Sequence, residues 1–179
     1  RKGMDVFGVI TIACITGLGG GSVSDTLLGV HPLTWVNAPS YILMVITAAI
    51  VAIFAVNFIV RKRKLFLILD ALGLVTFAYL GSTIGYHATH SIIIAIIMGV
   101  LTGVAGGMMR DILCNDIPLV FKSELYASIA IIVSVLTVVA IEFNLHSYLW
   151  AIGILVIGFA LRMLAIFKNI KLPTFHYQI

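Results

Sequence analysis

Thr16-Gly17-Leu18-Gly19-Gly20-Gly21-Ser22-Val23-Ser24-Asp25 recurs later in the chain as Thr102-Gly103-Val104-Ala105-Gly106-Gly107-Met108-Met109-Arg110-Asp111. The two stretches are offset by 86 residues, from Gly17 to Gly103. Glycine adopts backbone conformations that other residues avoid, and it leaves its carbonyl uncovered by a side chain. The chain is therefore an internal duplication that is organised around two glycine clusters.

The composition is that of a membrane protein, because 61% of the 179 residues are hydrophobic and only 10% are charged. Apolar runs of about 20 residues are long enough to cross a hydrocarbon core of about 30 Å. We read six such spans, at Val6–Leu28, Tyr41–Val60, Leu65–Tyr86, Ser91–Cys114, Leu125–Phe143 and Ser147–Phe167. The predicted fold is an all-α polytopic membrane protein with no soluble domain.

The basic residues lie on one face when the six spans alternate in direction. All 11 lysines and arginines then share that face: Arg1, Lys2, Arg61, Lys62, Arg63, Lys64, Arg110, Lys122, Arg162, Lys168 and Lys171. By the positive-inside rule this face and the C-terminus are cytoplasmic. The net charge of +4 thus follows membrane topology and indicates no nucleic-acid partner.

The same topology makes the two repeats inverted, since the first glycine span runs outward and the second runs inward. The span before the second cluster has no counterpart 86 residues earlier, so we expect a first helix that is absent from this chain. The predicted architecture is two inverted three-helix repeats plus a seventh helix. The expected units are residues 1–60, the repeat that lacks its first helix, residues 61–145, the second repeat, and residues 146–179, the final helix and a cytoplasmic tail.

The glycine clusters have two interpretations. Small residues let helices approach closely in membranes. Three consecutive glycines with an inverted copy also favour a kink or an unwound turn, which must face protein or a watery cavity. We predict pore kinks at five glycines: Gly19, Gly20, Gly21, Gly106 and Gly107. A bulky replacement such as Gly20→Leu or Gly106→Leu is expected to block conduction and leave assembly intact.

Hydroxyl side chains surround both clusters: Thr16, Ser22, Ser24 and Thr102. Hydroxyl and carbonyl oxygens can replace part of the water around a monovalent cation, and these residues are candidates to line a pore. The alternative is that each hydroxyl bonds to the preceding turn of its own helix.

Four charged residues complete the candidate site. Asp25 and Asp111 match position for position toward the ends of their helices, where they would concentrate cations at a pore mouth. The alternative is an interfacial cap or a local pair with Arg110. Arg110 aligns with Ser24 and is either a gate or an ordinary cytoplasmic anchor. Asp70 is a third candidate mouth acid, and the alternative is stabilisation by its helix N-terminus and the basic run before it.

Other reactive residues suggest no further site. Cys14 and Cys114 have no ligand at a metal-binding spacing and fit small buried hydrophobes. His87 and His90 lie in a short external turn without a carboxylate, which favours interfacial histidines over a metal site. No nucleophile–base pair, phosphate loop or zinc motif is present, so the chain is not predicted to be an enzyme.

Three ordered motifs resemble the bacterial and archaeal trimeric intracellular cation (TRIC) channels, which overlap a group of membrane proteins that includes proposed glycine exporters. The motifs are Gly19–Gly29 with His31-Pro32, Asp70–Leu74, and Gly103–Asp111 with Pro118-Leu119 and Glu124–Ala127. The resemblance implies a homotrimer in a prokaryotic inner membrane, with a potassium-permeable pore in each seven-helix protomer. The Lys-Glu-Val motif of animal members is absent, so their phosphoinositide control is not carried over.

Two functions follow as hypotheses. The first is a monovalent cation channel whose pore lies between the two glycine-kinked helices, with potassium as a transient permeant ion, no cofactor, and membrane lipid as a partner. The second is a small amino-acid transporter, for glycine or a similar solute, that uses the same inverted repeat for alternating access. A structural scaffold without transport would have little use for matched glycines and acids.

Overall fold

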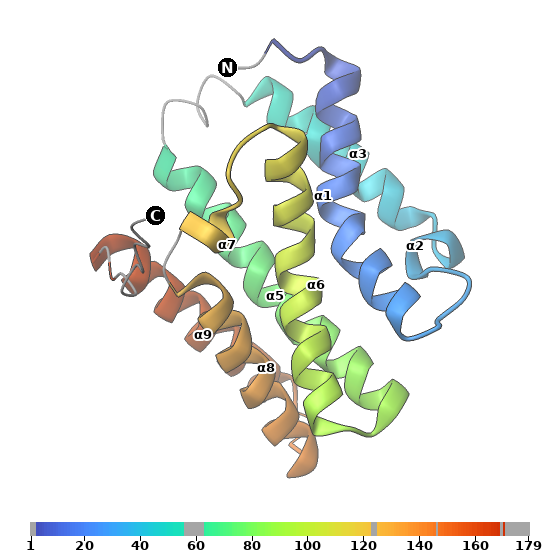
Figure 1. Cartoon of the computed structure of the whole chain (residues 1–179), viewed down its shortest axis with the longest axis vertical. Coiled ribbons are helices and arrows are strands. Elements are labelled where there is room, and N and C mark those ends of the chain that lie inside the picture. The colour runs from blue at the N-terminus through green and yellow to red at the C-terminus, as the bar shows by residue number, and fades with distance from the viewer. Residues whose placement is uncertain (1–2, 56–62, 123–124, 146, 169, 171–179) are drawn as a thin grey trace, which may run out of the picture.

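Helices make up almost all of the described chain (Figure 1). The structure is a computed structural model, and it describes residues 3–55, 63–122, 125–145, 147–168 and 170. The helices in this part of the chain are α1 (Val6–Leu27), α2 (Thr34–Asn37), α3 (Ser40–Phe54), α5 (Arg63–Thr89), α6 (Ile92–Leu113), α7 (Leu119–Lys122), α8 (Tyr126–Glu142) and α9 (Tyr148–Lys168).

The six expected spans correspond to the six longer helices. Within the described residues, α1, α5, α6 and α9 are long and apolar enough to cross a membrane, and α3 and α8 are shorter apolar helices. The last part of the predicted span at Tyr41–Val60 lies outside the described residues. The all-helical membrane fold is therefore confirmed, and the short helices α2 and α7 are additions that the apolar pattern did not predict.

The helix bounds repeat at the offset found in the sequence. α1 and α6 each have 22 residues, and both their first and last residues differ by 86. α3 begins at Ser40 and α8 at Tyr126, which is the same interval. α1 and α6 also begin alike, because Asp5 and Ser91 each accept a hydrogen bond from the amide three residues later. The duplication thus extends from the glycine clusters to whole helices.

Both long glycine helices end in the same turn. Gly29 and Asn115 have positive φ angles of 68° and 50°, in the left-handed region that favours glycine and asparagine. The following amide then donates to the carbonyl of the helix-end aspartate at 2.8 Å, in Val30→Asp25 and in Asp116→Asp111. After each of these turns the chain enters a short helix, α2 after α1 and α7 after α6.

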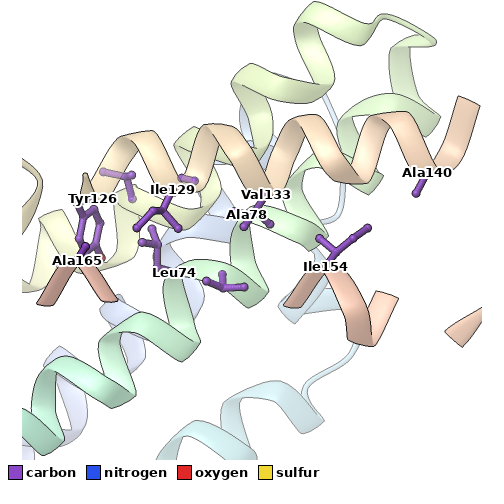
Figure 2. Close-up of a cluster of buried hydrophobic side chains, with 11 residues drawn as sticks. Leu74, Ala78, Tyr126, Ile129, Val133, Ala140, Ile154 and Ala165 are labelled. Carbon is purple, nitrogen blue, oxygen red and sulfur yellow. The ribbon is translucent and has the colours of Figure 1, made fainter. Parts of the chain in front are cut away.

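α5, α6, α8 and α9 share one hydrophobic core (Figure 2). Its buried residues are Leu74, Val75, Ala78, Val104, Tyr126, Ile129, Ala130, Val133, Ala140, Ile154 and Ala165. α6 also packs against α1, and α1 packs against α3, so α6 joins the two parts of the molecule. The second repeat and α9 therefore form one packed unit, and α1 packs against this unit through α6.

Candidate functional site

The two glycine helices cross with their backbones in contact. A Cβ atom added at Gly20 would overlap the carbonyl oxygen of Thr102, and one added at Gly106 would overlap the carbonyl oxygen of Thr16. These are the same pair of positions in the two repeats, so the contact is symmetric. α1 and α6 are nevertheless unbroken α-helices through their clusters. The predicted unwound turn is therefore wrong, the predicted kink stays a prediction, and the close-approach interpretation explains the crossing.

The other predicted pore glycines have different surroundings. A Cβ atom at Gly19 would lie 2.8 Å from the sulfur of Met109 on α6, whereas one at Gly21 would meet nothing within 4 Å. At Gly107 it would lie 3.2 Å from the hydroxyl of Tyr126. Glycine is thus required by contact at the crossing and not at every position of the cluster.

Two cavities flank the crossing. The first, which we name the Asp70 cavity, has a volume of about 210 Å³ and includes Thr16, Asp70, Phe77 and Arg110 in its lining. The second, the Asp25 cavity, has a volume of about 180 Å³ and includes Asp25, Phe77 and Thr102. A larger hollow of about 660 Å³ is lined mainly by apolar side chains of α1 and lacks acidic groups among the described residues. We therefore place the candidate site in the two smaller cavities.

The two cavities are related by the repeat. Thr16 and Thr102, which differ by 86 residues, line opposite cavities. The same holds for three further matched pairs: Gly103 with Gly17, Gly107 with Gly21, and Arg110 with Ser24. An inverted repeat places such pairs on opposite halves of the membrane. The cavities are therefore equivalent in position and differ in charge, because arginine in one replaces serine in the other.

Three of the four candidate hydroxyls donate within their own helices, whereas Ser24 Oγ on α1 donates to the sulfur of Met98 on α6 at 3.8 Å. Thr16 Oγ1 donates to the carbonyl of Ile12 at 2.7 Å, and Thr102 Oγ1 donates to that of Met98 at 2.6 Å. Ser22 Oγ donates to the carbonyl of Leu18 and accepts from the Trp35 ring nitrogen at 2.9 Å. A hydroxyl that donates one bond still has lone pairs to offer a cation. Thr16 and Thr102 therefore bond to the preceding turn of their helices, and this bond is compatible with the predicted role of lining a pore.

Asp25 and Asp111 anchor the turns that follow their helices. Asp25 is only 2% exposed, and its Oδ2 accepts the amide of Thr34 at 2.7 Å, at the start of α2. Asp111 Oδ2 accepts the amide of Leu119 at 2.9 Å, at the start of α7. α2 has no side-chain cap of its own, so this distant carboxylate supplies one. The capping role is observed, and the pore-mouth role stays a prediction.

Replacing Asp25 should loosen α2. Asp25→Ala removes the acceptor of the Thr34 amide, and the loss of a cap costs about 1 kcal/mol. We expect faster hydrogen exchange of the α2 amides, measured by mass spectrometry. Thr26→Ala is the control, because this exposed hydroxyl bonds only within α1, to Ser22. Equal exchange in both variants would show that the carboxylate does not hold α2.

Arg110 pairs with two acids, its neighbour Asp111 and the distant Asp70 of α5. Its Nη1 donates to Asp70 Oδ1 at 2.7 Å, and its Nε donates to Asp111 Oδ1 at 2.9 Å. The guanidinium also lies over the ring of Phe66, 4.8 Å from its centroid. The side chain of Asp70 is only 4% exposed, so the pair is largely withdrawn from solvent. Arg110 is therefore no simple interfacial anchor, and its role as a gate stays a prediction.

Arg162 is a second buried arginine, which the charge pattern had placed with the cytoplasmic anchors. It is 1% exposed, and its guanidinium lies 4.7 Å from the ring centroid of Tyr126. Tyr126 in turn lines the Asp70 cavity. Sequence reasoning missed both residues as neighbours of the site. The local signal for Arg162 was a single arginine within a long apolar run, and Tyr126 belongs to the Glu124–Ala127 motif.

The remaining sequence candidates line neither the Asp70 cavity nor the Asp25 cavity. Cys14 and Cys114 are half-buried thiols. His87 and His90 contact the ring of Tyr86 edge-on, and the Tyr86 hydroxyl donates to Glu142 at 2.7 Å. Within the described part of the chain, no three histidine, cysteine or acidic residues are grouped so that they could hold a metal ion.

The fold and the paired cavities define a multi-pass membrane protein with an inverted repeat. A sequence model of a family described as glycine transporter matches residues 1–57 and 67–142. The UPF0126 inner membrane protein YadS of Escherichia coli (strain K12) is 34% identical over 96% of this chain and 84% of its own length. A UPF0126 membrane protein of Vibrio cholerae is also 34% identical, over 98% of this chain and 74% of its own. The chain therefore belongs to this family of membrane proteins.

Solved structures extend the relationship to the TRIC channels. A chain from a study of conductance through TRIC cation channels superposes with a TM-score of 0.88 at 32% identity, over 99% of this chain and 88% of that one. A TRIC trimeric intracellular cation channel orthologue from Rhodobacter sphaeroides gives a TM-score of 0.86 at 30% identity, over 95% and 88%. The predicted resemblance is confirmed, and these relatives are described as channels and not as enzymes.

Proposed function

We propose that this protein is a monovalent cation channel that conducts potassium through each protomer. The observation that carries the proposal is the pair of repeat-related cavities on opposite sides of the α1–α6 crossing, each with a threonine of the glycine clusters in its lining. Hydroxyl and carbonyl oxygens suit a cation that must enter and leave easily. The superposition on TRIC cation channels supports the same function.

The assembly and orientation follow as parts of this proposal. The orthologue of known structure is described as trimeric, which supports a homotrimer. YadS is described as an inner membrane protein, which supports the same location here. The one-sided distribution of lysine and arginine supports a cytoplasmic C-terminus and contact with anionic lipid on that face.

Arg110 is proposed as the gating group. It holds Asp70 of α5 and Asp111 of α6 together beside the Asp70 cavity. A positive charge repels cations unless it is paired. The state in which Arg110 is bound to both carboxylates would therefore admit cations, and loss of one pair would oppose them.

The test is recording from the purified protein in planar lipid bilayers. We expect unitary currents in potassium chloride that reverse near the potassium equilibrium potential in a salt gradient. The absence of unitary current, together with saturable glycine uptake into vesicles, would overturn the channel proposal.

Glycine transport is the second candidate, and two observations favour it. One is the match to the family described as glycine transporter. The other is that Asp70 Oδ2 and Arg110 Nη2 are buried without hydrogen-bond partners among the described residues. These groups are complementary to the ammonium and carboxylate of zwitterionic glycine. Vesicle uptake of labelled glycine, compared with Asp70→Asn, tests this function directly.

A further inference from the structure

The glycine crossing is too tight to be the route of an ion. At Gly20 and Gly106 the two backbones touch, with no space for even a methyl group on either side. α5 also packs closely on α6, because a Cβ atom at Gly81 would overlap the side chain of Thr102. A path between the two cavities therefore passes between α1 and α5 and alongside α6, because these three helices line both cavities.

The linings of the two cavities meet in the region of the crossing. On α1 the lining of the Asp70 cavity reaches Thr16, and that of the Asp25 cavity begins at Gly17. On α6, which runs in the opposite direction, the change falls between Thr102 and Gly103. α1 and α6 thus each pass from one cavity to the other within a single residue step.

On α5 a single side chain lies between the residues that line the Asp70 cavity and those that line the Asp25 cavity. Leu69, Asp70, Gly73 and Leu74 line the Asp70 cavity, whereas Leu80 and Ile84 line the Asp25 cavity. Phe77 lies between these two sets, and among the described residues it alone lines both cavities. It is half-buried and sits near the middle of α5.

We propose that Phe77 is the apolar constriction that separates the two cavities and limits conduction, an inference that rests on the proposed channel function. A phenyl ring offers no oxygen to replace the hydration shell of a cation, and apolar constrictions close pores by excluding water. Thr16 of α1 lines the cavity on one side of Phe77, and Thr102 of α6 lines the cavity on the other side. An ion that crosses would therefore be coordinated by α1 and α6 and restricted by α5.

Single-channel conductance in a graded series tests this inference. We expect Phe77→Ala to raise the conductance by about twofold or more, Phe77→Leu to raise it less, and Phe77→Trp to lower it by about twofold or more. The leucine variant retains most of the packing volume and keeps the test valid if the alanine variant fails to fold. Gel filtration of each variant in detergent verifies assembly.

Leu72→Ala is the matched control. Leu72 lies on the same helix, is 46% exposed and lines neither cavity. Its truncation removes similar apolar bulk and should leave the conductance unchanged. If every Phe77 variant had the same single-channel conductance as the wild-type protein, the constriction would be overturned and the channel proposal would stand. A wild-type protein without unitary current would overturn the channel proposal itself, and the constriction would fall with it.

Discussion

Gly20→Ala should lower the melting temperature of the detergent-solubilised protein by about 5 °C, whereas Gly21→Ala should leave it unchanged or raise it slightly. The added methyl group at Gly20 would overlap the carbonyl oxygen of Thr102, which belongs to a helix backbone and cannot rotate away. Overpacking of this kind costs about 1–3 kcal/mol. Gly106→Ala should behave in the same way, because it meets Thr16 at the equivalent contact.

Gly21→Ala is the matched control for this prediction. A methyl group at Gly21 meets nothing within 4 Å, and alanine favours a helix over glycine by up to about 1 kcal/mol. Thermal unfolding followed by circular dichroism measures both variants. Equal melting temperatures would contradict the close crossing. The crossing also changes the expectation for Gly20→Leu, which should now disturb folding before it can block conduction.

Arg110→Leu should have the second large effect, a loss of about 3–5 kcal/mol of stability. The substitution leaves two carboxylates near each other without their shared cation, and the side chain of Asp70 is only 4% exposed. A buried charge without its partner is far more costly than the absence of the pair. Chemical unfolding of the solubilised protein measures the loss.

A double variant separates pairing from packing. Asp70→Asn combined with Arg110→Gln keeps polar groups at both positions and leaves only the Asp111 carboxylate without its cation, so it should be more stable than Arg110→Leu, which leaves two. Lys122→Leu removes an exposed cation nearby in sequence and should change stability little. If Arg110→Leu were as stable as Lys122→Leu, the ion pairs would not contribute to the fold.

The sequence predicted some properties of the site correctly and others incorrectly. The equivalence of Thr16 with Thr102 and of Asp25 with Asp111 was readable from the offset of 86 residues, and these residues lie at matched places in the structure. The unwound glycine turn was not found, because the same residues serve equally well for a close contact between intact helices. Consecutive glycines do not distinguish these outcomes until the partner helix is known.

Sequence by itself determined the apolar spans, their alternating direction and the inverted repeat, because each depends on local length, composition or charge. Tertiary structure alone decided that Asp70 meets Arg110, that Arg162 lies under Tyr126, and that Phe77 adjoins both cavities. Each depends on which face of a helix meets its neighbour. In a membrane helix, lipid-facing and protein-facing sides are both apolar, so hydrophobic periodicity does not mark the inner face.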